Sequence, residues 1–341
     1  MNMDEKIIRA KELLESSERP VFVFDDDCDG IASFLLLYGF VKKGTPMVIK
    51  SSPNLTEKYA TTINSFNPDL LVILDIALVQ EEALRMVGCD VIWIDHHEPQ
   101  EPQNTLYINP QLEGEEYPTS LATYNIVNDN LWLCVAGCIS DYYYPEELVE
   151  KLRIESPSLL DDKNSIDSIH YETNLGKIID ILSFSMKGTV KDALSLIRIL
   201  MKLESVNDLL IEDNKMKKLI KHYNNVKLKY DELKKNALES FQKQEGMLKV
   251  FFYDSDGWSL THELSSELAS YYPDNIIIVG RPYASRMLLS LRSRNHEIKS
   301  TLEKIMVSFD GTGGGHPHAC GANVLKEDAE RFIQSFKESY D

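Results

Sequence analysis

The 341-residue sequence lacks long apolar runs and is poor in cysteine. No stretch approaches the roughly 20 apolar residues that a membrane-spanning helix requires. The N-terminus opens with charged residues at positions 4–6 instead of the apolar core of a signal peptide. The five cysteines are scattered and form no Cys-x-x-Cys pair, so neither a disulfide framework nor a zinc ribbon is indicated. We therefore expect a cytoplasmic protein with reduced thiols and no membrane partner.

Low-complexity segments and internal repeats of fixed period are absent as well. The sequence is 43% apolar and 26% charged, which is ordinary for a globular protein and excludes collagen-like and mainly disordered classes. At roughly 100 to 200 residues per domain, a chain of this length predicts two domains.

Positive charge is scarce overall but is concentrated in two segments. Lys and Arg number 36 and Asp and Glu number 54, giving a formal net charge of −18, an average that argues against a nucleic-acid partner. Residues 214–235 nevertheless carry a net +6 and residues 281–304 a net +4, which leaves −28 for the remainder. Local basic surfaces are therefore compatible with this acidic chain.

The hydrophobic pattern of the first 150 residues is typical of a parallel sheet with crossover helices. Helices are predicted at 31–41 and 80–87. The predicted strands cover residues 21–24, 47–50, 70–74, 91–94 and 106–108.

A long amphipathic helix and a second strand–helix pattern follow. From residue 216 to Gly246 the apolar spacing alternates between three and four, which predicts a connector helix or, alternatively, a dimerising coiled coil. After it, strands are predicted at 248–253, 276–279 and 287–291, and helices at 262–271, at 298–307 and from about 326. The fold class is thus α/β, a parallel-sheet domain joined by a long connector helix to a smaller α/β domain. The expected boundaries are 1–185, a helical linker at 186–246, and 247–341.

Acidic residues follow three of the predicted strands directly. They are Asp25, Asp75 and Asp95, at the carboxyl edge where open α/β sheets place their sites. Four carboxylates occur within residues 25–29, where their repulsion favours compensation by hard cations. An exposed acidic turn is an equally weighted interpretation of that segment.

Further candidates are His96, His97 and Asp141. The two histidines follow a buried strand and Asp95, which suits metal ligation better than two surface imidazoles. Asp141 ends an apolar segment and is explained equally well as an N-cap or a loop acid.

The C-terminal region contains a glycine-rich segment, residues 311–321, with Gly313, Gly314, Gly315 and His316. Glycines let backbone N–H groups approach an anion closely, so a phosphate site is favoured over a flexible loop. Upstream, Arg292 near a strand end could clamp a phosphate, or be an ordinary surface arginine.

The sequence His262-Glu263 lacks the second histidine of a zinc-protease helix and is interpreted as an ordinary helical face.

The ordered set of these motifs resembles the DHH phosphoesterase superfamily. It consists of Asp-x-Asp-x-Asp-Gly, a strand-end Asp, Asp-His-His, Gly-x-x-Ser-Asp and Gly-Gly-Gly-His, and it extends from Asp25 to Gly321. Within it, the chain resembles RecJ-like nucleases with a DHH-associated C-terminal domain, and it looks closer to the compact archaeal type than to bacterial RecJ. The resemblance implies a metal-binding catalytic domain at 1–185 and a substrate-binding domain at 247–341.

The resemblance also implies roles for individual residues. Asp25 and Asp27 would hold one divalent metal ion, and Asp29, His96 and Asp141 a second, with Asp75 bridging the two. Manganese is expected, with magnesium as the alternative. His97 would contact the phosphate or handle a proton, and Asp95 would orient the histidines. The implied substrate-binding residues are Ser290, Arg292, Gly313, Gly314, Gly315 and His316.

The implied activity is a single-strand-specific exonuclease on DNA or RNA. Two metal ions would generate hydroxide from a bridging water at neutral pH. Because compact relatives include enzymes that trim from the 3′ end, 3′-to-5′ polarity is expected. The active cleft is expected at the domain boundary, with the basic 214–235 helix contacting phosphates.

Two alternatives stay open: a phosphodiesterase for oligonucleotides, cyclic dinucleotides or nucleoside bisphosphates, and a non-catalytic scaffold. The expected partners are single-stranded DNA or RNA and a replication, repair or helicase complex.

Overall fold

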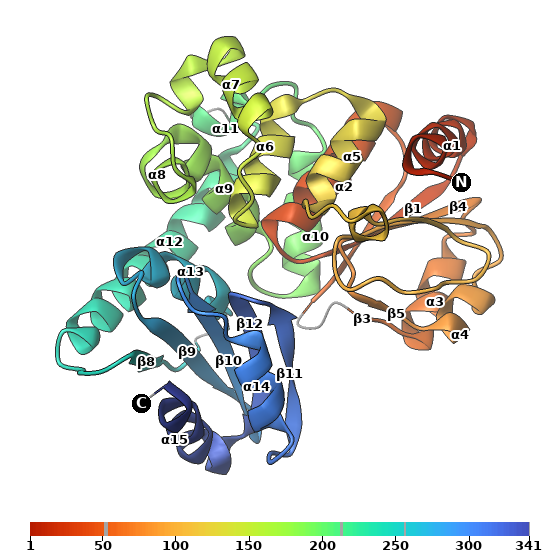
Figure 1. The fold of residues 1–341 in the computed structure, drawn as a ribbon. Coiled ribbons are helices and arrows are strands. Elements are labelled where there is room, and N and C mark those ends of the chain that lie inside the picture. Colours follow the sequence, from red (N-terminus) through yellow and green to blue (C-terminus); the bar gives the residue numbers. More distant parts are fainter. Residues whose placement is uncertain (51–53, 212–213, 256, 341) are drawn as a thin grey trace. The chain divides into compact units, whose positions relative to one another are not determined.

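The structure of the protein, a computed structural model, describes residues 1–50, 54–211, 214–255 and 257–340 (Figure 1). The chain divides into two compact units, Met1–Tyr223 and Asn224–Asp341, and the boundary falls within helix α12 (Lys217–Phe241). Within the described ranges, no helix is both long enough and apolar enough to cross a membrane.

Unit 1 contains a five-stranded parallel sheet with the order β2-β1-β4-β6-β7. The strands are β1 (Pro20–Asp25), β2 (Thr45–Ile49), β4 (Leu70–Leu74), β6 (Asp90–Ile94) and β7 (Leu106–Ile108). All five predicted strands are confirmed. From β1 the chain continues to β2 on one side, and from β2 it returns past β1 to β4 on the other side. This reversal makes the β1/β4 boundary the topological switch point of the sheet. A short parallel pair, β3 (Asn54–Leu55) with β5 (Leu78–Val79), lies outside this sheet.

Helices cover both faces of the unit 1 sheet (Figure 1). Because side chains alternate along a strand, Phe22 and Phe24 face α2 (Cys28–Val41), where both rings pack on Phe34 at centroid distances of 5.5 and 4.6 Å. Val21 and Val23 face the other way and join the apolar core that includes α3 (Glu57–Ser65) and α4 (Glu81–Met86). The central strands of this sheet are buried on both faces, which explains why their sequences are continuous apolar runs.

The rest of unit 1 is mainly helical. The helices are α1 (Met3–Ser16), α5 (Thr119–Val127), α6 (Leu131–Ser140), α7 (Glu146–Glu155), α8 (Ile166–Glu172), α9 (Asn174–Ser185), α10 (Val190–Leu200) and α11 (Asn207–Leu210).

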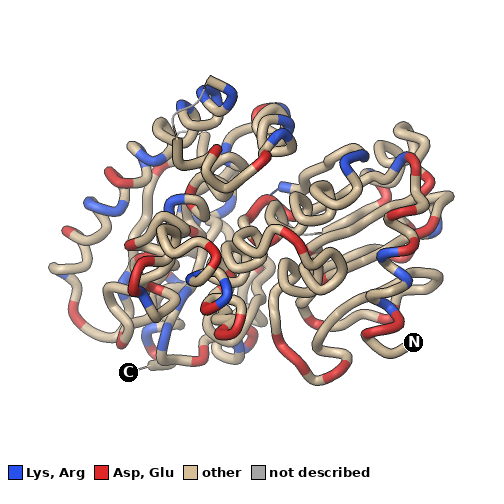
Figure 2. Tube along the Cα trace, turned by 90° about the horizontal axis from the view of Figure 1, so that it is seen from above, with Lys and Arg blue, Asp and Glu red and all other residues tan. Residues whose placement is uncertain are grey.

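Acidic residues outnumber basic ones along the Cα trace (Figure 2).

Unit 2, the smaller of the two units, contains a second five-stranded sheet with the order β11-β12-β10-β9-β8. Its β8 and β9 are parallel, and the other neighbours are antiparallel. Helices α14 and α15 pack on one face and α13 on the other. The elements are β8 (Leu248–Phe252), α13 (Thr261–Tyr271), β9 (Ile276–Tyr283), β10 (Arg286–Ser293), α14 (Lys299–Met306), β11 (Gly311–His316), β12 (Ala319–Leu325) and α15 (Ala329–Tyr340).

The glycine-rich segment is a strand, which excludes the alternative interpretation of a flexible loop. Residues 311–316 form β11 and pair with β12, which was not predicted from the sequence. A Cβ atom at Gly311 would lie 1.9 Å from the carbonyl oxygen of Asn323, and one at Gly313 would lie 2.9 Å from Cγ of Met306 in α14. Glycine is needed here because neighbouring groups approach the strand closely.

Candidate metal centre and substrate-binding face

Three acidic side chains meet at the carboxyl ends of β1, β4 and β6. Asp25 is the last residue of β1, Asp75 follows β4 and Asp95 follows β6. The Asp75 N–H donates to the carbonyl oxygen of Ile94 at 3.0 Å, so the hydrogen-bond ladder extends to this residue. Asp75 adopts a φ of 57°, an uncommon conformation that aspartate tolerates better than most residues. The strand ends therefore bring Asp25 and Asp75 to the switch point and Asp95 to the strand end beside it.

The start of α2 supplies two more carboxylates. Asp27 is the N-cap and accepts the N–H of Gly30 at 2.9 Å. Asp29, only 1% exposed, accepts the N–H groups of Thr119 at 2.8 Å and Ser120 at 3.0 Å. Thr119 and Ser120 were not predicted from the sequence. The sequence feature that could have indicated them is Pro118 followed by Thr119, which is typical of a helix start, where free N–H groups attract an anion.

Two glycines permit this packing. A Cβ atom at Gly30 would lie 2.7 Å from the carbonyl oxygen of Asp25, so α2 can begin this close to β1 only with glycine there. A Cβ atom at Gly137 of α6 would lie 2.4 Å from Oγ of Ser120 and 2.8 Å from Oδ1 of Asp29. The Gly-x-x-Ser-Asp motif therefore reflects close approach of α6 to the carboxylate cluster.

Asp141 is the C-cap of α6, which corrects the N-cap interpretation. Its N–H donates to the carbonyl oxygen of Gly137 at 3.1 Å. The Nε2 atom of His96 lies 3.6 Å from Oδ2 of Asp141 and 3.4 Å from Oδ1 of Asp75. His96 thus lies between a strand-end carboxylate and a helix-end carboxylate.

His97 is held by Asp95, which is fully buried. Nδ1 of His97 is 2.8 Å from Oδ1 of Asp95, and the His97 N–H donates to Oδ2 at 3.1 Å. Two residues that sequence reasoning missed hold the backbone: the amides of Asn109 and Gln111 donate to the carbonyl oxygens of His97 and His96, at 2.9 and 2.6 Å. No motif signals these two amides in the sequence.

Asp75 belongs to three groups of side chains that could each hold a cation. Within each group the possible ligand atoms lie within 4.8 Å of one another. The groups are Asp25, Asp27 and Asp75; Asp29, Asp75 and His96; and Asp75, Asp95 and His97. Oxygen-rich sets with a single imidazole suit manganese or magnesium, so the donor chemistry fits such ions.

The electrostatics of the acidic cluster also favour cations. Burial, with the charge of Asp75 as the next cause, raises the pKa of Asp29 to about 7. The pKa values of Asp25 and Asp27 are also raised well above the ordinary value, because burial and neighbouring carboxylates oppose ionisation. Cations bound here would relieve this repulsion.

The pKa values of Asp75 and His97 are shifted in the directions that favour the charged forms of these side chains. Burial opposes ionisation of Asp75, but the hydrogen bond and charge of His96 lower its pKa to about 2. Burial likewise opposes a charged His97, but Asp95 raises the pKa of that imidazole to about 9. The centre therefore combines an ionised shared carboxylate with a protonated histidine at neutral pH.

In unit 2, four of the six predicted substrate-binding residues fall into two rows across the sheet. Arg292 in β10 and His316 in β11 both pair with Ala319 of β12, from opposite sides. Directly paired residues share a face, and two strand spacings separate their Cα atoms by about 10 Å. Ser290 and Gly314 flank Gly321 in the same way, on the same face.

This face of the sheet is open at Gly314. A Cβ atom at Gly314 would meet no atom within 4 Å. Gly313 and Gly315 belong to the opposite face, since side-chain direction alternates along β11. Gly315 has a φ of 140°, and a Cβ atom there would lie 2.3 Å from the carbonyl oxygen of Ala319. Of the three glycines of the motif, Gly314 is thus the one on the face of Arg292 and His316.

Arg292 is 7% exposed and makes four hydrogen bonds within unit 2. Its donors reach Oγ of Ser266 at 3.2 Å, the carbonyl oxygens of Leu291 at 2.8 Å and Cys320 at 3.1 Å, and Nδ1 of His262 at 2.9 Å. The guanidinium is therefore fixed in position. His262, interpreted from sequence as an ordinary helical residue, is one of its partners.

Ser290 is also held internally, because its Oγ lies 2.9 Å from Oγ of Ser265 in α13.

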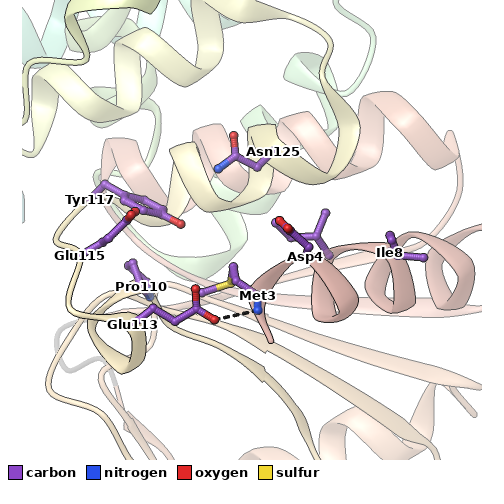
Figure 3. A pocket seen from close by; sticks show the side chains of 9 residues that line it. Met3, Asp4, Ile8, Pro110, Glu113, Glu115, Tyr117 and Asn125 are labelled. Carbon is purple, nitrogen blue, oxygen red and sulfur yellow. Dashed lines mark hydrogen bonds between the residues drawn. The ribbon is translucent and has the colours of Figure 1, made fainter. Parts of the chain in front are cut away.

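A separate cavity of about 640 Å³ lies beside α1 (Figure 3). Asp4, Glu113 and Glu115 line it together with apolar side chains, and Glu113 accepts the N–H of Met3 at 2.7 Å. None of the predicted site residues belongs to its lining. The carboxylate cluster at the strand ends is therefore a different feature of unit 1.

A doubly wound sheet with carboxylates and histidines at its switch point, followed by a smaller α/β unit, defines a two-domain α/β protein with a candidate metal centre. Residues 21–152 match the DHH family N-terminal domain, and residues 257–340 match the DHHA1 domain. Together the two models cover more than half of the chain, and the chain belongs to the DHH family.

Solved structures with the same fold include two RecJ proteins. RecJ from Thermus thermophilus in complex with Mn²⁺ is 14% identical, with a TM-score of 0.71 over 99% of this chain and 54% of that chain. The chain thus spans about half the length of that protein. An exonuclease RecJ bound to manganese is 15% identical, with a TM-score of 0.65 over 100% of this chain and 94% of that chain.

A pGpG-specific phosphodiesterase from Vibrio cholerae is 12% identical, with a TM-score of 0.50 over 95% of this chain and 99% of that chain. At these identities the likenesses show a shared fold. Comparison with curated protein sequences gives no match.

Proposed function

We propose that this protein is a metal-dependent phosphodiesterase that acts as an exonuclease on single-stranded DNA or RNA. The observation that carries the proposal is the position of Asp75, which lies within 4.8 Å of potential ligand atoms from three sets of side chains. A carboxylate shared in this way is the arrangement that a pair of divalent ions requires. The manganese-bound RecJ structures that share the fold support the same reading.

In this proposal Asp25 and Asp27 would hold one ion, Asp29, His96 and Asp141 would hold the other, and Asp75 would be a ligand of both. Manganese fits these donors, and magnesium is the alternative. When bound, such a pair supplies a hydroxide from water at neutral pH and offsets the negative charge of the phosphodiester.

His97 is proposed as the acid at the phosphate. Asp95 engages its Nδ1 atom, so Nε2 is the ring nitrogen that can donate to a substrate. With a pKa of about 9, the imidazole carries this proton at neutral pH. Donation from Nε2 to the leaving oxygen would allow the P–O bond to break without releasing an alkoxide.

The DHHA1 unit is proposed to bind the substrate phosphate through Arg292 and His316, over the open face at Gly314. Because its guanidinium already makes four hydrogen bonds within unit 2, Arg292 would attract the phosphate through its charge more than through a bidentate pair of hydrogen bonds. Ser290 would support this arrangement through Ser265.

The basic segment 214–235 is proposed to contact strand phosphates. Within α12, Lys227 pairs with Asp231 at 3.0 Å and Lys229 with Glu232 at 3.3 Å, while the segment keeps a net +6. Replacing the exposed Lys217 and Lys221 by glutamate should weaken strand binding and flatten its salt dependence. Unchanged binding would exclude this role.

A small-nucleotide phosphodiesterase is the second candidate, and the fold shared with the pGpG-specific enzyme favours it. The experiment is a time course with single-stranded DNA and RNA labelled at either end, and with a dinucleotide, each with manganese, magnesium or chelator.

Metal-dependent ladders on long strands support the exonuclease, and early loss of the 3′ label supports 3′-to-5′ polarity. Cleavage of the dinucleotide alone supports the second candidate. No cleavage of any substrate contradicts both and favours a scaffold in a replication or repair complex. Asp75→Asn is the inactive control.

A further inference from the structure

A second arginine, Arg281 in β9, lies on the same face of the unit 2 sheet as Arg292. In the β9–β10 register Arg292 pairs with Ile277, and Arg281 pairs with Leu288, four residues away along either strand. Because paired residues share a face and side chains alternate along a strand, the two arginines point to the same side of the sheet. Strand geometry separates their Cα atoms by about 14 Å. Arg281 is also the first residue of the basic segment 281–304.

This face of the sheet becomes more open toward the turn between β9 and β10. Along β9, Ile277 is fully buried, Arg281 is 8% exposed and Tyr283 is 64% exposed. Helix α13 covers the buried end, where its Ser265 contacts Ser290 of β10. The end of the face at Arg281 and Tyr283 is therefore the part that a ligand can reach.

The open part of the face continues across the sheet to Gly314. The row that contains Arg281 also contains Asn323 of β12, which is half-buried, and Thr312 of β11, which is exposed. Gly314 lies in the next row, on the same face. Arg281 and the proposed phosphate-binding residues therefore border one open strip of the sheet.

Arg281 carries a charge that no protein carboxylate offsets. Its Nε atom donates to Oγ of Ser259 at 3.1 Å, and its guanidinium carbon lies 5.6 Å from the centre of the Tyr283 ring. Among the residues that the structure describes, no carboxylate forms an ion pair with it. Arg286, on the same face at the turn, instead pairs with Asp310 at 3.1 Å. Withdrawing a guanidinium from water without a carboxylate costs free energy, which an anionic ligand would offset.

Tyr283 supplies an aromatic ring beside this charge. It follows Arg281 by two residues in β9, so the two side chains share a face, and Tyr283 is the further of the two from Arg292. The bases of single-stranded nucleic acids stack on exposed aromatic rings, and arginines beside such rings bind the backbone phosphates. The pair thus combines the two groups that recognise one nucleotide of a strand.

We propose that Arg281 and Tyr283 form a second strand-binding subsite, in which the guanidinium contacts a backbone phosphate and the ring stacks on a base of single-stranded DNA or RNA. This subsite rests on the proposed function of the DHHA1 unit in binding the substrate phosphate. Because adjacent phosphates of a strand are closer than the separation of the two arginines, Arg281 contacts a phosphate beyond the neighbour of the one at Arg292. A dinucleotide does not reach both arginines, so the subsite favours longer strands.

The test compares a long strand with a dinucleotide. The probes are a labelled oligothymidylate of roughly twelve nucleotides and pTpT, long enough and too short respectively to span the strip. Binding to the full chain is measured at several salt concentrations, with chelator present so that the strand stays intact. The variants are Arg281→Gln, Arg281→Lys and Tyr283→Ala. Arg286→Gln is the matched control, because it removes the same charge from the same face, where Asp310 already pairs it.

Arg281→Gln should bind the long strand about tenfold more weakly, since a charged hydrogen bond to phosphate is lost. The slope of log affinity against log salt should also fall by about 0.7, the value for one phosphate contact of a single strand. Arg281→Lys should keep the wild-type slope because the charge stays. Tyr283→Ala should weaken binding about tenfold without changing the slope, because stacking releases no counterions. The affinity for pTpT should stay at the wild-type value in every variant.

Three results would overturn the proposal: wild-type affinity and slope in Arg281→Gln, an equal loss in Arg286→Gln, or equal losses for the long strand and pTpT. Failure of the wild-type protein to bind the long strand would overturn it as well. Thermal unfolding shows whether each variant is folded, and Tyr283→Ala, at an exposed position, tests the subsite even where Arg281→Gln is unstable. The separate hydrolysis assay with manganese tests the nuclease assignment: no hydrolysis, together with strand binding that depends on Arg281, would reject catalysis and retain the subsite.

Discussion

Asp95 Oδ1 lies 2.8 Å from Nδ1 of His97, and the other oxygen of the same carboxylate accepts the His97 backbone N–H at 3.1 Å. The carboxylate is fully buried, so it holds both the ring and the backbone of one neighbour. Rotation of the imidazole would break the ring contact and leave a buried charge without that partner. The orientation of His97 is therefore set by Asp95.

Asp95→Asn should lower kcat about 10- to 100-fold with little change in KM, because the neutral amide holds the imidazole less firmly and stabilises its charge less. Steady-state kinetics on a labelled strand with saturating manganese measure this effect. Thermal unfolding serves as the control for folding. A variant with wild-type kcat and a raised KM would show that His97 acts in substrate binding alone.

Asp75→Asn should abolish high-affinity binding of both metal ions and lower activity roughly 1000-fold, since metal ions contribute several kcal/mol of transition-state stabilisation. Asparagine accepts the φ of 57° well, so the backbone should persist. Calorimetric titration with Mn²⁺ measures the stoichiometry. Asp141→Asn is the comparison and should affect one ion; two ions retained in Asp75→Asn would contradict a shared ligand.

Asp69 gives a pH-dependent contribution to stability away from the site. Partial burial works against its charge, but the hydroxyl of Ser17 at 2.5 Å and the N–H groups of Glu18 and Arg19 at 2.8 and 2.9 Å lower its pKa. A lowered folded-state pKa stabilises the protein above the unfolded value of about 3.9 and loses this contribution as pH falls through the folded value.

Asp69→Asn should accordingly reduce the free energy of unfolding by about 1.5 kcal/mol at pH 7, the value of a hydrogen bond to a charged group. The difference between the variant and the wild type should shrink below about pH 4. Urea unfolding at both pH values measures this. An equal difference at the two pH values would mean that the charge of Asp69 is not involved.

Gly137→Ala should destabilise unit 1 by about 1 to 3 kcal/mol, because the added Cβ atom would lie 2.4 Å from Oγ of Ser120 and 2.8 Å from Oδ1 of Asp29. Gly88→Ala is the matched control, since a Cβ atom there meets no atom within 4 Å. Denaturant unfolding compares the two variants. Equal stability of both would show that α6 can shift without cost.

Much of the first sheet was predictable because its signals are local. Strands such as Leu70–Leu74 are continuous apolar runs, and such runs followed by an acidic residue indicate a buried strand with a polar carboxyl end. The meeting of Asp25, Asp75 and Asp95 follows from this pattern together with parallel pairing. Their role as metal ligands or, for Asp95, as an orienting group stays a prediction.

Other features were not predictable because they depend on distant parts of the chain. The glycines of β11 resemble a loop in sequence, and the need for small residues there comes from Asn323 and Met306. Asp141 follows an apolar segment and was open to an N-cap reading, but that segment is the helix that it ends. His262 has no motif of its own, and its partner Arg292 comes from a different strand.

The sequence by itself determined the α/β class, the parallel strands of the first sheet and the positions of the strand-end carboxylates, because hydrophobic periodicity and chain order are local properties. Only the tertiary structure decided that Asp75 is shared by three groups, that Thr119 and Ser120 hold Asp29, and that His262 holds Arg292. Each of these relationships depends on strand register and helix packing between residues far apart in the chain, which no local pattern encodes.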